Sequence, residues 1–176
     1  VTTYGHSIEN TMFCIPMMSA YLSRLKATTE NLTENVSLWI SDFESQVQKL
    51  LVFDILNDLR PRGYCCKCLT LGFPRFSIGD GYFDNTKISN FVKEASEIYN
   101  LSERKQIEEK IKTSDKPIYK IIQGHFLEGA VNEFLRKNAN CSLSRKAIYA
   151  EFSCCRELCK DSCKDIEFIK TEINNA

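Results

Sequence analysis

The chain has 176 residues, 43% of them hydrophobic and 26% charged, and its 23 Lys and Arg residues balance its 23 Asp and Glu residues. This composition is typical of a globular protein and excludes bulk disorder, so we expect one domain or two small domains that are closely fused. The balanced charge does not indicate nucleic-acid binding, which a basic excess or stripe usually marks. No apolar run approaches the roughly 20 residues that a membrane-spanning helix needs.

Two helices are predicted in the first third of the chain. Pro16 is tolerated in the first turn of a helix, and an apolar face then continues to about residue 26 through Met18, Tyr21, Leu22 and Leu25. A longer stripe with steps of three and four predicts the clearest helix, over residues 36–59, and Pro61 ends it. Trp39 lies beside this stripe and is interpreted as a core aromatic residue.

Residues 64–84 have a different character, because they combine three cysteines with Gly72, Pro74, Gly79 and Gly81. They are predicted to form an irregular loop pinned by disulfides, with a short strand near residues 75–78. Long loops in compact domains are often functional. The candidate partner surface of this loop consists of apolar residues, namely Leu71, Phe73, Phe76, Tyr82 and Phe83. The alternative is that these side chains form a cap over the helical core.

The second half of the chain is predicted to be helical with short breaks. Apolar spacing predicts helices over residues 88–98 and 102–112. Ser114 and Asp115 precede Pro117 and mark the start of a helix that continues to about residue 137. Further helices are expected from Ser142 or Ser144 and near the end of the chain, where Ile166, Ile169 and Ile173 recur.

We therefore predict a mainly α-helical fold, a disulfide-stapled bundle of about six or seven helices. Residues 1–84 are expected to form a first helical unit and residues 85–176 a second, within one compact domain. An internal duplication would explain two units, because Asn31-Leu32-Thr33-Glu34-Asn35 resembles Asn100-Leu101-Ser102-Glu103-Arg104, and residues 64–68 resemble residues 153–159. Coincidence is the alternative, and the sequence leaves both open.

Nine cysteines predict an oxidising compartment, since the reducing cytosol seldom tolerates such a density without metal or redox use. They are Cys14, Cys65, Cys66, Cys68, Cys141, Cys154, Cys155, Cys159 and Cys163. N-glycosylation sequons point the same way, at Asn31, Asn35, Asn100 and Asn140. We expect a secreted, extracellular glycoprotein. Because the sequence begins at Val1 and not at a methionine, we interpret it as a mature form whose signal peptide has been removed. Zinc held by cysteine thiolates is the disfavoured alternative.

The odd number of cysteines leaves one thiol free or paired between chains, and the sequence does not reveal which cysteines are joined. We expect a monomer, with a dimer linked through the ninth cysteine as the alternative.

Nothing in the sequence indicates catalysis. His6 and His125 are the only histidines, and no nucleophile elbow, phosphate-binding loop or HExxH motif is present. We expect no enzyme activity, no cofactor and no metal site.

Two cysteine- and tyrosine-bearing segments carry a family resemblance. Tyr64-Cys65-Cys66-Lys67-Cys68 is one, and the other runs from Cys141 through Tyr149 to Cys154-Cys155. They resemble the two cysteine-tyrosine-cysteine units of the bicycle family of aphid salivary effectors. The resemblance implies delivery into a plant host and binding there, with no catalytic residues to carry over.

The function expected from the sequence is that of a secreted, non-enzymatic effector or modulator that binds a host or partner protein. Two alternatives stay open: a cytokine-like extracellular ligand or receptor ectodomain, and a carrier of a small apolar ligand.

Overall fold

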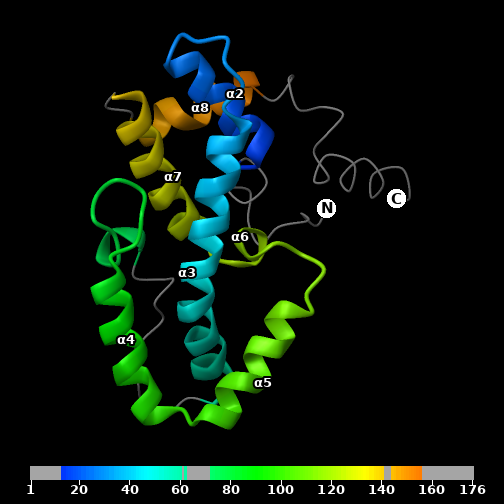
Figure 1. The fold of residues 1–176 in the computed structure, drawn as a ribbon, viewed down its shortest axis with the longest axis vertical. Coiled ribbons are helices and arrows are strands. Elements are labelled where there is room, and N and C mark those ends of the chain that lie inside the picture. The colour runs from blue at the N-terminus through cyan, green and yellow to red at the C-terminus, as the bar shows by residue number, and fades with distance from the viewer. Residues whose placement is uncertain (1–12, 61, 63–71, 141–143, 156–176) are drawn as a thin grey trace.

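The computed structural model describes residues 13–60, 62, 72–140 and 144–155, and this part of the chain is mainly α-helical (Figure 1). The prediction of a mainly α-helical fold is confirmed. No helix in the described residues is both long enough and apolar enough to cross a membrane. In chain order its elements are α2 (Ile15–Leu25), α3 (Thr33–Leu59), the 3-10 helix η2 (Phe73–Arg75), α4 (Asn85–Ile98), α5 (Leu101–Lys112), α6 (Ile118–Ile121), α7 (Gly124–Ala139) and α8 (Arg145–Cys155).

Helix α3 is the central element of the fold, and α2, α4, α5 and α6 all pack against it. Figure 1 shows α4 and α5 on either side of its lower half, meeting below its end. The burial of α3 matches this position, because four successive residues from Leu50 to Phe53 are buried. Successive residues are about 100° apart around a helix, so such a run requires neighbours on every side.

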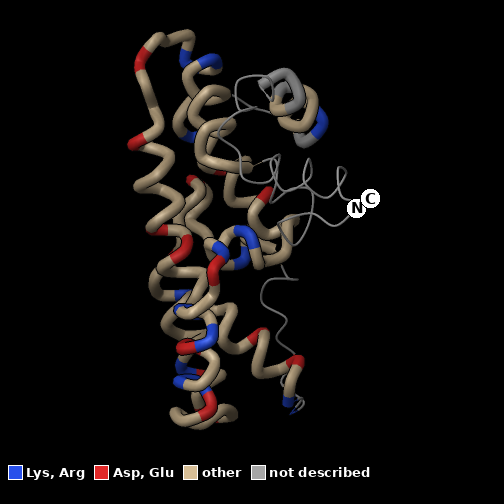
Figure 2. The backbone as a smooth tube through the Cα atoms, turned by 90° about the vertical axis from the view of Figure 1, so that its right-hand side faces the viewer, with Lys and Arg blue, Asp and Glu red and all other residues tan. Residues whose placement is uncertain are grey.

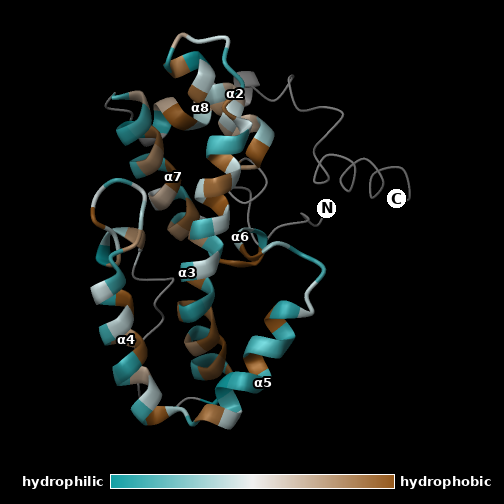
Figure 3. Ribbon diagram, in the orientation of Figure 1, coloured by the Kyte–Doolittle hydropathy of each residue, from teal (hydrophilic) through white to brown (hydrophobic). Residues whose placement is uncertain are grey.

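The core is a contiguous cluster of buried side chains that extends from Phe13 to Phe152. Trp39 is buried in this cluster and stacks on Phe43 at 5.6 Å and on Phe134 at 4.4 Å between ring centroids. The interpretation of Trp39 as a core residue is therefore confirmed. Figure 3 shows hydrophobic residues along α3 and mainly hydrophilic ones along α5, so α5 is an outer helix.

The lower end of α3 is joined to α5 by a buried carboxylate. Glu103 Oε1 accepts hydrogen bonds from Arg60 Nη1 at 2.7 Å and from Arg62 Nη2 at 2.6 Å. Arg62 also donates to the backbone oxygen of Ile98 and lies over the ring of Tyr99. These contacts hold the junction between α4 and α5 against the end of α3.

The single helix predicted from residue 117 to about residue 137 is wrong, because the chain forms α6 and α7 with a break between them. Ile122 is extended and buried, and Gln123 is the N-cap of α7. Helix α6 packs on α3, and the break at Ile122 lets α7 pack on η2 and α2 as well as on Trp39 of α3 through Phe134. Glu44 on α3 fixes the start of α6, because its Oε1 accepts from the Tyr119 N–H at 3.0 Å.

The short strand predicted near residues 75–78 is also absent. Residues 73–75 form η2, for which Pro74 supplies a preset φ, and one isolated bridge joins Ser77 to Phe83. Residues 63–71 lie outside the described part of the chain, as do Ile166, Ile169 and Ile173.

Candidate binding loop

Residues 77–83 form a narrow loop between η2 and α4, which we call the 77–83 loop (Figure 1). The loop closes on itself, because the Ile78 N–H donates to the Tyr82 oxygen at 3.2 Å and the Asp84 N–H donates to the Phe76 oxygen at 2.7 Å. Gly79 and Gly81 both have positive φ angles, of 91° and 87°, which other residues seldom adopt. The turn therefore depends on its glycines.

Two helices hold the loop from outside. The indole Nε1 of Trp39 on α3 donates to the Gly81 oxygen at 2.8 Å, and this bond is buried. From α7, Glu133 Oε2 accepts from the Gly81 N–H at 3.4 Å. A Cβ atom at Gly81 would lie 2.6 Å from the backbone of Phe134, so no other residue fits without a shift. The loop is thus fixed at its tip and at its base.

The phenylalanines of this region point inward. Phe73, Phe76 and Phe83 are buried and contact the rings of Phe126 and, for Phe76, Phe91. They form the cap over the helical core, which was the alternative interpretation, and they are not available as a partner surface. Of the other candidates, Leu71 lies outside the described residues and Tyr82 is exposed.

Tyr82 is the one predicted surface residue that is exposed in the described part of the chain, and two residues that were not predicted are exposed beside it. Ile78 is 61% exposed and Tyr82 is 38% exposed at the tip, and Leu38 on α3 is 64% exposed. Leu38 precedes Trp39, so the indole bond to Gly81 brings this part of α3 alongside the loop. Two features of the sequence could have indicated that Leu38 and Ile78 are exposed. Leu38 does not belong to the apolar stripe of its helix, and Ile78 directly precedes a turn-forming Gly79-Asp80-Gly81 segment.

Acidic groups surround Tyr82. Asp80 Oδ1 accepts from the Tyr82 N–H at 3.0 Å, and Asp42 lies one helical turn after Leu38. Partial burial raises the pKa of the Tyr82 phenol, and the charges of Asp42 and Asp80 raise it further. The phenol therefore stays neutral at physiological pH and can both donate and accept a hydrogen bond.

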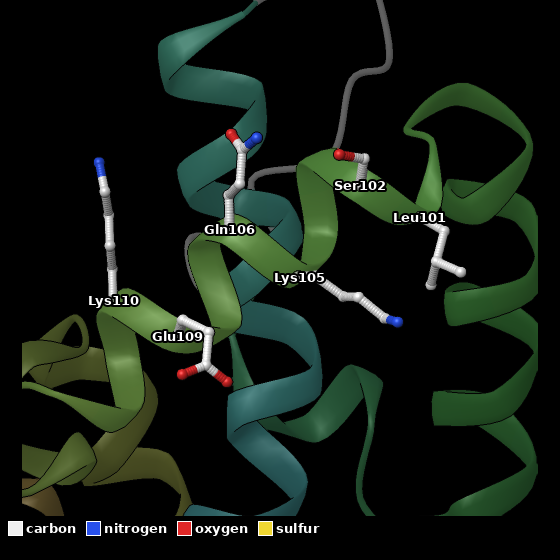
Figure 4. Close-up of a pocket in the computed structure, with 6 residues that line it drawn as sticks. All are labelled: Leu101, Ser102, Lys105, Gln106, Glu109 and Lys110. Carbon is white, nitrogen blue, oxygen red and sulfur yellow. The ribbon is translucent and has the colours of Figure 1, made fainter.

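A second surface feature, a shallow hollow of about 870 Å³, lies on the outer side of α5 (Figure 4). Two rows of side chains with a spacing of four residues line it, Leu101, Lys105 and Glu109 in one and Ser102, Gln106 and Lys110 in the other. All six belong to one helix, and Figure 4 shows them directed to different sides. They do not converge on a point where a reacting atom could be held.

His125 is the histidine that lies in the described ranges, and it contacts a buried carboxylate. This residue lies in the first turn of α7 with its side chain 64% exposed, and its Nδ1 is 3.3 Å from the buried Glu128 Oε2. Within the described ranges no three His, Cys, Asp or Glu residues are grouped so that they could hold a metal ion. His6 lies outside these ranges.

Three of the nine cysteines lie in the described part of the chain, namely Cys14, Cys154 and Cys155. Cys14 is buried at the entrance of α2. The side chains of Cys154 and Cys155 in α8 are not described, and the remaining cysteines lie outside the described residues: Cys65, Cys66, Cys68, Cys141, Cys159 and Cys163. The predicted disulfides therefore stay predictions.

The four sequon asparagines all lie in the described part of the chain, and all are exposed: Asn31, Asn35, Asn100 and Asn140. Asn100 is the N-cap of α5, and Asn140 ends α7 in the left-handed conformation. Each is placed where a glycan could project into solvent.

No protein-family model matches the chain, and no curated protein or solved structure matches it. The function is therefore argued from the 77–83 loop and its surroundings.

Proposed function

We propose that this chain is a secreted, non-enzymatic protein that acts by binding a partner protein of a host, and that the tip of the 77–83 loop is part of its binding surface. One observation carries the proposal. The loop is held in a single conformation from α3 and α7 while it presents Ile78 and Tyr82 outward.

A loop of this kind suits protein recognition for two reasons. Preorganisation lowers the entropy cost of binding, because the loop need not be ordered when the partner arrives. Tyr side chains also supply a large contact area with a polar end, and they are enriched among the residues that dominate binding energy. The buried Phe76 and Phe83 anchor the loop on either side of this tip.

Secretion is supported by the number of cysteines and by the four sequons, whose asparagines are all exposed. The resemblance of residues 64–68 and of the segment from Cys141 to Cys155 to the bicycle family favours a host-directed effector in particular. The hollow on α5 does not favour a carrier of apolar ligands, because it is open to solvent and all six residues that line it belong to one helix.

The proposal is tested by affinity capture from candidate host extracts with the glycosylated wild-type protein and the double variant Ile78→Ser/Tyr82→Ser. We expect the wild type to retain a specific protein and the variant to retain at least about tenfold less of it, because the variant removes the apolar anchors of the surface. Both residues are exposed, so circular dichroism and the melting temperature should stay unchanged.

Leu101→Ser is the matched control, because Leu101 is 57% exposed and lies on α5, away from the loop. This variant should retain the partner as well as the wild type does. Equal capture by the double variant and the wild type would refute the assignment of the loop, and conversion of any substrate by the wild type would refute a purely binding role.

A further inference from the structure

The exposed apolar residues of the described chain are not spread evenly. Large apolar side chains are exposed at five positions, and Leu38, Ile78 and Tyr82 are three of them. The bond from Trp39 to Gly81 holds the two segments that carry them together. We call these three side chains the Tyr82 patch.

The charges beside this patch are not neutralised within the described residues. No Lys or Arg there forms an ion pair with Asp42 or Asp80, whereas Asp84 is 3.8 Å from Lys87. The charges of both Asp42 and Asp80 act on the Tyr82 phenol. Figure 2 shows Lys and Arg interspersed with Asp and Glu in the lower half of the molecule.

The cations nearest to the loop are directed to its backbone. Lys87 Nζ donates to the Ser77 oxygen at 2.9 Å, and Arg136 Nη2 donates to the Gly79 oxygen at 3.4 Å. Both cations thus donate to backbone oxygens of the loop, and neither forms an ion pair with Asp42 or Asp80. An approaching partner therefore meets apolar side chains that are flanked by negative charge.

We infer that the occupant of the Tyr82 patch is a protein segment that presents Lys or Arg next to an apolar side chain. The inference rests on the proposed function and specifies the chemistry of its partner. The apolar side chain of the partner contacts Leu38, Ile78 and Tyr82, and its cation lies near Asp42 and Asp80. Charges at such a rim act mainly on the association rate and on the salt dependence of binding.

The probe is a short capped peptide composed of Lys and Leu, compared with a Glu and Leu peptide of the same length by titration calorimetry. We expect wild-type protein to bind the Lys peptide at least about tenfold more tightly than the Glu peptide at low ionic strength, with this preference reduced in about 0.5 M NaCl. Equal affinities for the two peptides would overturn the inference.

The double variant Asp42→Asn/Asp80→Asn removes both charges and leaves an oxygen at residue 80 to accept the Tyr82 N–H. Its preference for the Lys peptide should fall to about twofold or less. The matched control is Glu97→Gln/Glu108→Gln, which removes the same number of charges from α4 and α5 and should behave as the wild type does. The same loss in both double variants would show a general charge effect and would overturn the inference.

Capture experiments separate this inference from the proposed function. A partner that requires Ile78 and Tyr82 but binds Asp42→Asn/Asp80→Asn normally would overturn the inference and leave the function standing. A wild-type protein that captures no partner would overturn the function. Self-association that Ile78→Ser abolishes, measured by sedimentation, would identify a second copy as the occupant and would also overturn the inference.

Discussion

Residues 31–35 and residues 100–104 have nearly the same sequence, and each leads into a helix that packs on the core. At the second segment Asn100 is the N-cap: its Oδ1 accepts from the Glu103 N–H at 3.0 Å, and its own N–H donates to Glu103 Oε2 at 3.1 Å. At the first segment the Asn31 oxygen accepts from the Thr33 N–H, and α3 begins two residues later, at Thr33. The same residue types thus start the two helices in different registers.

The burial of the two segments is reversed as a result. Leu32 is only 7% exposed, whereas Leu101 is 57% exposed, and Glu34 is exposed where Glu103 is buried. A shared pattern therefore indicates that a helix starts here, but the neighbouring elements decide which residue faces inward. The structure gives no support to the hypothesis of an internal duplication at these segments.

The largest expected difference in stability is between substitutions of the two leucines, Leu32 and Leu101. Leu32→Ala should lower the free energy of unfolding by about 2–3 kcal/mol, because it removes buried methyl groups and leaves a cavity. Leu101→Ala should change it by less than about 0.5 kcal/mol, since its side chain is largely in solvent. Chemical denaturation of both variants measures the contrast, and equal losses would contradict the assigned registers.

A smaller difference in stability, which depends on pH, is expected between substitutions of Glu103 and Glu34. Hydrogen bonding from Arg60 lowers the pKa of Glu103, and Asn100 and Arg62 lower it further against the opposing effect of burial. Glu103 therefore stabilises the fold above the ordinary glutamate pKa of about 4.3, and this stabilisation is lost as the pH falls through the lowered value.

Glu103→Gln should accordingly be less stable than the wild type at neutral pH, and the difference should shrink as the solution becomes acidic. Glu34→Gln is the matched control and should unfold as the wild type does at every pH. Thermal unfolding across a pH series tests both variants. A Glu103→Gln deficit that persists unchanged in acid would show that packing, and not the charge, is responsible.

The smallest difference in stability is expected between substitutions of Asn100 and Asn31. Asn100→Ala removes the N-cap of α5 and should cost about 1 kcal/mol. Asn31→Ala removes one hydrogen bond ahead of α3 and should cost about half as much, because Asn31 is not the cap residue of that helix. Unfolding measurements on protein made without glycans isolate this effect, and a larger loss at Asn31 would contradict the comparison.

Sequence reasoning located most helices because their apolar residues recur every three or four positions. It placed the core Trp39 correctly, and the start predicted from Pro16 agrees with α2. Of the two starts that it left open, at Ser142 and Ser144, the second agrees with α8. It missed the break at Ile122, because a buried isoleucine fits the helical spacing whether or not the backbone turns there. It left open whether Phe73, Phe76 and Phe83 form a partner surface or a cap over the core, since aromatic residues in a glycine-rich loop have no periodicity to show their direction.

The sequence alone determined the helical class of this protein, since periodicity, capping residues and prolines are local properties of the chain. Only the tertiary structure decided that Gly81 meets Trp39 and Phe134, that Glu103 meets Arg60 and Arg62, and that Ile78 and Tyr82 remain outside. These contacts join residues far apart in the sequence, and their geometry depends on how helices pack around α3 rather than on any short segment.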